Sequence, residues 1–391
     1  MILLARGRFG ATATRVMEPL RVHGPMARET IAARSGLSLA TVARTVATLQ
    51  GERLVRERPD LVEPGTVGRP RVPVEIDPDH FAVLGVHVGR KATTVSLVDL
   101  AGRPAAHVRV ATPAGSRTRG SAVSPVAVDA LVATVSKAAA GLVARHSHRT
   151  LLSAGVVAPW FDLGLAQEDV RRRVELATGL ETAAADHVAA VAAAEYLARE
   201  EALSGCTMYL YARDTAGFAL ANDLPRRTEI SRVGRLSHFP TGSDALCRCG
   251  ATGCLEATIS DEAVAAQARV LGVIGSGDID ALRAAAYGGN GRAHNLLADR
   301  ARVLGRTAAV VRDMVDPDRV VLVGQAFTGY PPVLDDVVAA LHDRSVLGPV
   351  DVSFTRFGAG VQAAAAGAVA LVPVYEDPLA LVRADGAVAN L

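Results

Sequence analysis

Three of the four cysteines in this 391-residue chain lie within eight positions of one another. They form the pattern Cys247-x-Cys249-x4-Cys254, and His238 precedes the first of them by nine residues. Three thiolates and one imidazole at this spacing can converge on a single tetrahedral zinc, and a closed set of four protein ligands is typical of a structural site. The alternative is three core cysteines beside a surface histidine. The clustering favours zinc.

Glycines interrupt this segment at Gly242, Gly250 and Gly253. A chain that turns tightly around a metal needs backbone conformations that residues with a Cβ rarely adopt, and glycine supplies them. The pattern therefore predicts a compact loop around the metal rather than an ordinary strand or helix.

Composition indicates an ordinary globular protein, because 50% of the residues are apolar and 21% are charged. The length favours two or three domains. Arg6 and Arg8 follow too short an apolar start for a signal peptide. The longest uncharged run, 357–375, is rich in Ala and Gly, so we expect a closely packed helix and strand rather than a membrane span. Unpaired cysteines and no targeting segment point to the cytoplasm.

Charge is distributed unevenly along the chain. Residues 1–75 contain 12 Arg and 7 acidic residues, a net charge of +5, so the remainder of a chain with net charge +2 carries −3. A basic N-terminal part on a mildly acidic body favours a polyanion as partner of the first part. A solvated basic face would give the same count.

Three helices are predicted between residues 11 and 59. The second covers roughly 27–35, and the third covers roughly 39–50. Gly36 suits the left-handed position that ends a helix, and Ser38 is a good N-terminal cap for the next. This pattern is typical of a helix-turn-helix.

The third predicted helix has two different faces. Val42, Val46 and Leu49 form an apolar stripe, and polar residues lie away from it. A recognition helix needs this division, and Arg44 could pair bidentately with a guanine. An amphipathic surface helix is the alternative. The residues predicted to contact DNA, here and in the wing that follows, are Ser38, Thr41, Arg44, Thr45, Thr48, Arg69 and Arg71.

A two-stranded wing is predicted after residue 54, with its tip near Pro64 and Gly65. The Gly68-Arg69-Pro70 segment at its end is narrow, so Arg69 could enter a minor groove. The alternative is a Gly- and Pro-rich linker between domains.

Two sequence motifs resemble those of the ROK family of bacterial sugar kinases and sugar-responsive transcription factors. One is a Gly and a His followed by C-x-C-G-x-x-G-C-L-E, and the other is GLSLATVARTVATLQ followed by GRP. The resemblance implies an α/β fold: a winged helix-turn-helix domain at 1–76, then a two-lobed, actin-like (ribonuclease H-like) ROK domain at 77–391.

The resemblance also implies where kinase chemistry would lie, and those positions are altered. The phosphate loop Asp-x-Gly-Gly-Thr is replaced by His87, Val88, Gly89, Arg90 and Lys91. Either Asp186 or His187 occupies the position of the catalytic base, and Arg235 replaces the Glu of Glu-x-Gly-His. A second nucleotide loop, 212–217, has lost most of its glycines. We therefore expect no catalytic residues and no enzyme activity.

A ligand pocket is still expected from the resemblance. His238 and Glu256 match positions that contact sugar in the family, and Asp186 could hold a hydroxyl group. Arg235 and His187 make the pocket more basic, which favours an anionic ligand such as a sugar phosphate or sugar acid. The alternative is a pocket that no longer binds anything.

The sequence thus favours a cytoplasmic transcriptional regulator, a repressor of carbohydrate-related genes, controlled by a sugar or sugar-phosphate effector. It would bind an inverted-repeat operator in double-stranded DNA as a homodimer or a dimer of dimers, without a membrane partner. Two alternatives remain: an ATP-dependent sugar kinase with a DNA-binding arm, and a regulator controlled by a protein partner.

Overall fold

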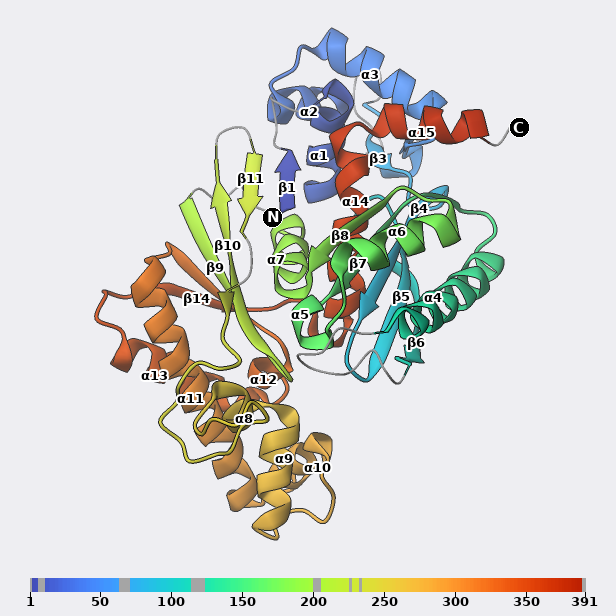
Figure 1. Ribbon diagram of the computed structural model, residues 1–391. Coiled ribbons are helices and arrows are strands. Elements are labelled where there is room, and N and C mark those ends of the chain that lie inside the picture. The colour runs from blue at the N-terminus through green and yellow to red at the C-terminus, as the bar shows by residue number, and fades with distance from the viewer. Residues whose placement is uncertain are drawn as a thin grey trace. The chain divides into compact units, whose positions relative to one another are not determined.

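The computed structural model of the protein describes residues 2–5, 11–62, 71–113, 124–199, 205–224, 227–231 and 234–388 (Figure 1). The chain forms two compact units. The first consists of Met1–Ser204, Asp223–Ile230 and Gly360–Leu391, and the second consists of Gly205–Asn222 and Ser231–Ala359. Each unit is described by itself.

The first unit contains the predicted helix-turn-helix, which follows the short strand β1 (Ile2–Ala5). Its helices are α1 (Thr12–His23), α2 (Arg28–Ser35) and α3 (Leu39–Gly51). Gly36 ends α2 in the left-handed conformation, with φ 64°. The Ser38 hydroxyl caps α3 by accepting a hydrogen bond from the Thr41 backbone N–H at 3.1 Å. The three predicted helices and both of these turn residues are confirmed.

The wing is described only at its base. There β2 (Val55–Glu57) pairs antiparallel with β3 (Val74–Ile76), and the short helix η2 (Pro59–Leu61) follows β2. The predicted wing tip and Arg69 lie outside the described residues. The domain boundary predicted after residue 76 falls at the end of β3 and stays a prediction.

A five-stranded sheet in the order β6-β5-β4-β7-β8 forms the centre of the first unit. Strand β5 pairs antiparallel with both β4 and β6, and β7 and β8 continue the sheet in parallel with β4. The remaining β-strands of this unit, β1 and β11, pair antiparallel with each other. The bounds are β1 Ile2–Ala5, β4 Phe81–Val88, β5 Ala92–Val98, β6 Pro104–Ala111, β7 Thr150–Ala158, β8 Thr182–Asp186 and β11 Arg227–Ile230.

Helices pack on this sheet from several parts of the sequence (Figure 1). They are α4 (Pro125–Arg145), α5 (Trp160–Leu163), α6 (Gln167–Thr178), α7 (His187–Leu197) and α14 (Val361–Glu376), and α15 (Pro378–Val388) follows them. By length and hydropathy, α4 is the one candidate for a membrane span among the described residues. Its buried side chains, Val128 to Leu142 at helical spacing, instead face the sheet and α6.

Helix α14 packs against β4 and β7 at very short range. A Cβ built on Gly155 of β7 would lie 2.4 Å from the Ala370 backbone N and 2.8 Å from the Ala366 carbonyl oxygen. The helix and strand predicted over 357–375 are wrong in part, because α14 is a single helix through this run. Its small residues allow the close approach. Pro373 lies in the last turn, where it cannot donate a hydrogen bond to the Val369 carbonyl oxygen.

The helix-turn-helix shares one hydrophobic core with the rest of the first unit. Buried side chains of α1, α2 and α3 belong to the same cluster as Phe81, Leu100 and Val374. Polar contacts reinforce it: the Thr14 hydroxyl of α1 donates to the Tyr375 carbonyl oxygen at 2.9 Å, and the Tyr375 hydroxyl donates to the Leu100 carbonyl oxygen at 2.6 Å. The helix-turn-helix is therefore held against the body of this unit.

Arg21 of α1 joins this contact region. Its guanidinium donates to the carbonyl oxygen of Leu197, the last residue of α7, and lies 5.6 Å from the centre of the Tyr375 ring. At the other end of α7, the Asp186 carboxylate caps the helix by accepting the Val188 N–H at 3.0 Å. Helix α7 thus connects β8 with α1.

The second unit contains a parallel ladder in which β13 lies between β9 and β14, and β12 pairs antiparallel with β10. Helices α11 and α13 pack closely on each other: a Cβ on Gly305 would lie 2.4 Å from the Val337 carbonyl oxygen. The bounds are β9 Gly205–Ala212, β10 Ala216–Asp223, β12 Gly234–Arg235, β13 Arg319–Val323, β14 Asp351–Phe354, α8 Leu255–Ile259, α9 Asp261–Val270, α10 Ile279–Tyr287, α11 Gly291–Val315, α12 Gln325–Thr328 and α13 Leu334–Arg344.

The contact between β7 and α14 gives a stability prediction. We expect Gly155→Ala to lower the free energy of unfolding by about 1–3 kcal/mol, because the new methyl group meets backbone atoms that cannot yield. Gly141→Ala in α4 is the matched control, since its Cβ would meet only Arg145 Nη1 at 3.7 Å. There we expect a gain of about 0.5–1 kcal/mol. Urea unfolding measures the free energy of unfolding of both variants. Equal changes in Gly155→Ala and Gly141→Ala would contradict the close contact between β7 and α14.

Candidate functional site

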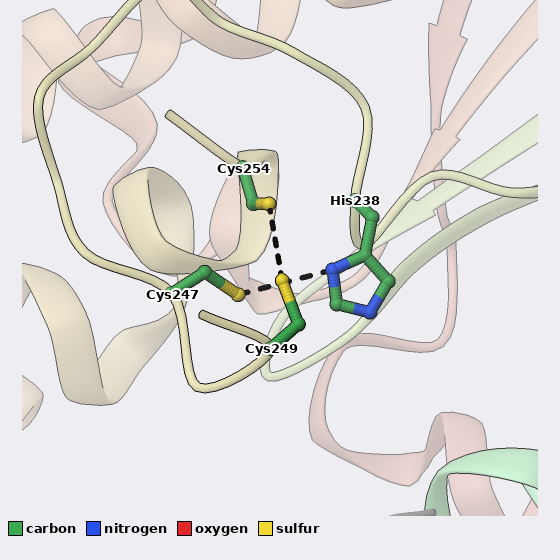
Figure 2. A group of neighbouring side chains, drawn as sticks. All are labelled: His238, Cys247, Cys249 and Cys254. Atoms are coloured by element: carbon green, nitrogen blue, oxygen red, sulfur yellow. Dashed lines mark hydrogen bonds between the residues drawn. The ribbon is translucent and has the colours of Figure 1, made fainter. Parts of the chain in front are cut away.

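The side chains of His238, Cys247, Cys249 and Cys254 converge in the second unit (Figure 2). One ligand atom from each lies within 4.8 Å of all the others. The Cys247 Sγ lies 3.8 Å from His238 Nδ1, and the Cys249 Sγ lies 3.7 Å from the Cys254 Sγ. Among the described residues this is the one group of at least three potential ligands that could hold a metal ion.

The backbone of this loop has the conformations expected from its glycines. Gly242, Gly250 and Gly253 have φ values of 77°, 90° and 75°. A Cβ on Gly253 would also lie 2.6 Å from the Ser243 carbonyl oxygen. The turn is closed by the Gly250 N–H, which donates to the Cys247 carbonyl oxygen at 2.9 Å. Cys254 then occupies the N-cap position of α8.

The pKa values of two cysteines in the cluster shift in opposite directions. Burial, together with the neighbouring sulfurs, raises the pKa of the Cys254 thiol to about 11, whereas the backbone N–H of Ala251 lowers the pKa of Cys249. A divalent cation would compensate the charge of thiolates here, since metal ligation requires deprotonated sulfur. The donor set and its convergence fit a tetrahedral metal site.

The predicted DNA-contacting residues of the first unit lie around α3. Arg44 is exposed, and among the described residues its side chain makes no hydrogen bond or ion pair. Arg71 is also exposed and lies 3.9 Å from Glu29. The hydroxyls of Thr45 and Thr48 are half-buried and donate to the carbonyl oxygens of Thr41 and Arg44 at 2.9 and 3.2 Å, and the Ser38 and Thr41 hydroxyls lie 2.8 Å apart.

The positions expected to carry kinase chemistry in the first unit contain a buried histidine pair. His87 Nε2, at the end of β4, lies 2.8 Å from His187 Nδ1, at the start of α7. One nitrogen must donate and the other accept, so the two rings cannot both be imidazolium in this arrangement. Both residues are recognisable in the sequence, but their contact is not predictable from it, because only the order of the strands in the sheet brings residues 100 positions apart together.

The predicted ligand-binding residues are divided between the two units. Asp186 and His187 belong to the first unit, and Arg235, His238 and Glu256 belong to the second. Within the second unit, Arg235 is exposed on β12, and Glu256 is buried in the first turn of α8. The role of these residues in one pocket stays a prediction.

The second unit also contains a buried ion cluster that sequence reasoning missed. Asp261 accepts from Arg300 at 2.8 Å and from Arg213 at 3.3 Å, and Arg283 lies 3.6 Å away. Although burial opposes it, Arg300 and the other two cations hold the pKa of Asp261 below its usual value. Arg213 lies in the loop 212–217, which was expected to have lost its nucleotide-binding glycines. Its ion pair with Asp261 ties this loop to the start of α9.

A helix-turn-helix within the first unit, α/β sheets in both units and a Cys3His cluster thus define the class of protein: an α/β body with an N-terminal helix-turn-helix. Residues 83–374 match the ROK family, and the chain belongs to this family. It is similar to Transcriptional regulator Rv0485 of Mycobacterium tuberculosis, with 38% identity over 96% of this chain and 89% of the relative. It also resembles the N-acetylglucosamine repressor of Escherichia coli O157:H7, with 24% identity over 83% of this chain and 82% of the relative.

Solved structures agree on the fold. The crystal structure of a ROK family transcriptional regulator, a homologue of the Escherichia coli MLC protein, has a TM-score of 0.71 and covers 95% of this chain and 98% of its own at 20% identity. A ROK glucokinase from Streptomyces griseus has a TM-score of 0.59 and covers 74% of this chain and 99% of its own at 20% identity. The predicted fold class is confirmed, and so is the prediction that the protein is a transcriptional regulator.

The Cys3His cluster gives a prediction about metal content. We expect purified protein to contain about one divalent metal ion per chain and Cys249→Ser to contain much less, with a lower melting temperature, because a structural metal contributes folding free energy. Cys206→Ser is the matched control, since Cys206 lies outside the cluster. Elemental analysis and thermal unfolding measure both effects. Undiminished metal in Cys249→Ser would show that this sulfur is not a ligand.

Proposed function

We propose that this protein is a DNA-binding repressor of carbohydrate-related genes whose affinity for its operator changes when an anionic sugar derivative binds. The observation that carries the proposal is the shared core of the helix-turn-helix and the ROK body in the first unit. A recognition module held in this way moves with the body that would bind the effector. The name of the N-acetylglucosamine repressor supports a sugar-related signal.

The DNA part of the proposal assigns different tasks to the arginines. Arg44, exposed on α3, reads a guanine in the major groove, and Arg71 at the base of the wing contacts phosphate. Arg69 has the minor-groove role predicted from its sequence context. Ser38, Thr41, Thr45 and Thr48 lie close to the same duplex. Two-fold symmetry of a homodimer, or of a dimer of dimers, matches an inverted-repeat operator.

The metal of the Cys3His cluster is zinc in this proposal, with a structural role. Three cysteines and one histidine leave no open position for catalysis, and soft thiolates favour zinc over magnesium or calcium. The cluster connects the loop before α8 with Cys254 at its N-cap. Zinc would thereby fix the start of α8, where Glu256, a proposed effector contact, lies in the first turn.

Loss of kinase activity is proposed from the residues at the former phosphate loop, catalytic base and nucleotide loop. Phosphoryl transfer needs a carboxylate base, a metal-binding carboxylate and a backbone cradle for phosphate. His87 and His187 bond each other at 2.8 Å, the Asp186 carboxylate caps α7, and Arg213 is paired with Asp261. These contacts differ from the arrangement that phosphoryl transfer needs, so the chain acts in the cytoplasm as a regulator that senses its ligand without transforming it.

The effector is proposed to bind Asp186, His187, Arg235, His238 and Glu256, with Arg235 as the main contact of an anionic group. Thermal shift with a panel of neutral sugars, sugar acids and sugar phosphates tests this, because a ligand that binds the folded state raises the melting temperature. We expect the sugar phosphates or sugar acids to stabilise the protein and Arg235→Ala to abolish the effect. If no compound in the panel stabilises it, control by a protein partner becomes the better proposal.

The absence of phosphoryl transfer is tested with a coupled assay. We expect ATP turnover with a panel of hexoses to stay at background for this protein. A turnover of about 1 per second or more, within the ordinary range of enzymes, would contradict the proposal.

The two described arginines are distinguished by their effects on specificity. We expect Arg44→Ala to lose about 1–3 kcal/mol on the operator and to relax the preference at one base pair in each half-site. Arg71→Ala is expected to weaken binding to all sequences and to make its salt dependence shallower. Fluorescence anisotropy on operator and scrambled duplexes at several salt concentrations measures both. If Arg44→Ala binds every duplex like the parent, α3 is not the reading helix.

A further inference from the structure

The outer face of α3 agrees with the sequence pattern at Arg44 and differs from it at the threonines. Its buried stripe is Val42, Val46 and Leu49. The threonines at 41, 45 and 48 are half-buried beside this stripe, and the hydroxyls of Thr45 and Thr48 donate to carbonyl oxygens of the same helix. The threonines therefore flank the face that points to solvent.

The solvent-facing side of α3 is almost entirely apolar. Ala40, Ala43, Arg44 and Ala47 are all exposed and recur at the i, i+3, i+4, i+7 spacing of one helix face. Leu39, in the first turn, extends this face and exposes 49% of its surface. We call these five residues the α3 outer face. Arg44 is its only charged group.

Small side chains determine how this face can meet a duplex. Three alanines leave the helix backbone at the surface, so α3 can enter a major groove deeply without displacing long side chains. With only Arg44 able to donate hydrogen bonds from the centre of the face, few base edges can be recognised by hydrogen bonding. The surrounding methyl and methylene groups need an apolar partner in the groove.

Only one base presents such a group. Thymine carries its C5 methyl in the major groove, whereas the other base edges there show donors and acceptors. We expect thymines at the positions that meet the apolar part of the face, because the thymine methyl group gives Leu39 and the alanines an apolar contact that the other bases do not offer. Arg44 would recognise a guanine next to these thymines through hydrogen bonds to its O6 and N7.

We propose that the α3 outer face reads the operator mainly through thymine methyl groups, which pack on Leu39, Ala40, Ala43 and Ala47, with Arg44 marking one guanine in each half-site. This inference rests on the proposed DNA-binding function and adds the chemistry of the sequence that is read. It makes Leu39 and the three alanines specificity-determining residues.

The test begins with selection of duplexes from a random pool by the full-length protein. The selected operator is then resynthesised with deoxyuridine in place of thymidine, one position at a time, which removes the methyl group and keeps base pairing. We expect two or more positions in each half-site at which affinity falls about fourfold, the effect of losing one buried methyl group. Deoxyuridine between the half-sites, away from α3, is expected to have no effect.

Protein variants connect these losses to the helix. Leu39→Ala is expected to reduce the deoxyuridine effect at one position of each half-site and leave the others unchanged. Leu176→Ala is the matched control, because Leu176 is 84% exposed but lies on α6. It should retain every deoxyuridine effect. Circular dichroism and thermal unfolding confirm that both variants are folded.

Different outcomes would overturn methyl reading by α3 and specific DNA binding. If selection enriches an operator but deoxyuridine changes affinity at none of its positions, the protein binds DNA specifically and the proposed methyl reading is overturned. If selection enriches no sequence at all, specific DNA binding itself fails and both proposals fall. Deoxyuridine effects that persist unchanged in Leu39→Ala would also overturn the assignment of this contact.

Discussion

The contact on which the first unit depends is the packing of α14 against β4 and β7. Gly155 has no room for a side chain because α14 backbone atoms lie where a Cβ would be. This close approach fixes the end of α14, and Tyr375 near that end bonds both the Thr14 hydroxyl and the Leu100 carbonyl oxygen. Hydrophobic residues of α1 to α3 close around the same point. The recognition module therefore has no separate core, and its position is determined by a helix from the far end of the sequence.

In the second unit, charge has a comparable organising role. Asp261 begins α9 and lies beside Arg300 of α11, Arg283 of α10 and Arg213 of the loop after β9. Buried ions are tolerated only when they are paired, because removing one partner leaves an uncompensated charge in a medium of low polarity. The cluster holds four segments of the second unit together: α9, α10, α11 and the loop after β9. Removing Asp261 would therefore leave the buried Arg300 uncompensated in the interior of the second unit.

Local features of the fold could be predicted from the sequence, and contacts between distant segments could not. The α3 helix was predicted to within one residue because Val42, Val46 and Leu49 set its period and Ser38 its start. The convergence of the cysteines and His238 followed from ligand spacing over seventeen positions. In contrast, the bond between His87 and His187 depends on the order of β4, β7 and β8, which no local pattern encodes. The run at 357–375 was divided wrongly, since small residues suit a close-packed helix as well as a strand.

Helix α7 gives the first unit a stiff connecting element. It begins at Asp186 and His187, and eleven residues later Leu197 accepts a hydrogen bond from Arg21 of α1. An α-helix of this length spans about 16 Å and resists compression, because each turn is closed by its own hydrogen bonds. The first turn of α7, with its buried histidine, and helix α1 are therefore joined through one helix and one arginine side chain. The helix keeps its two ends at a constant separation, so the only adjustable part of this connection is the Arg21 side chain.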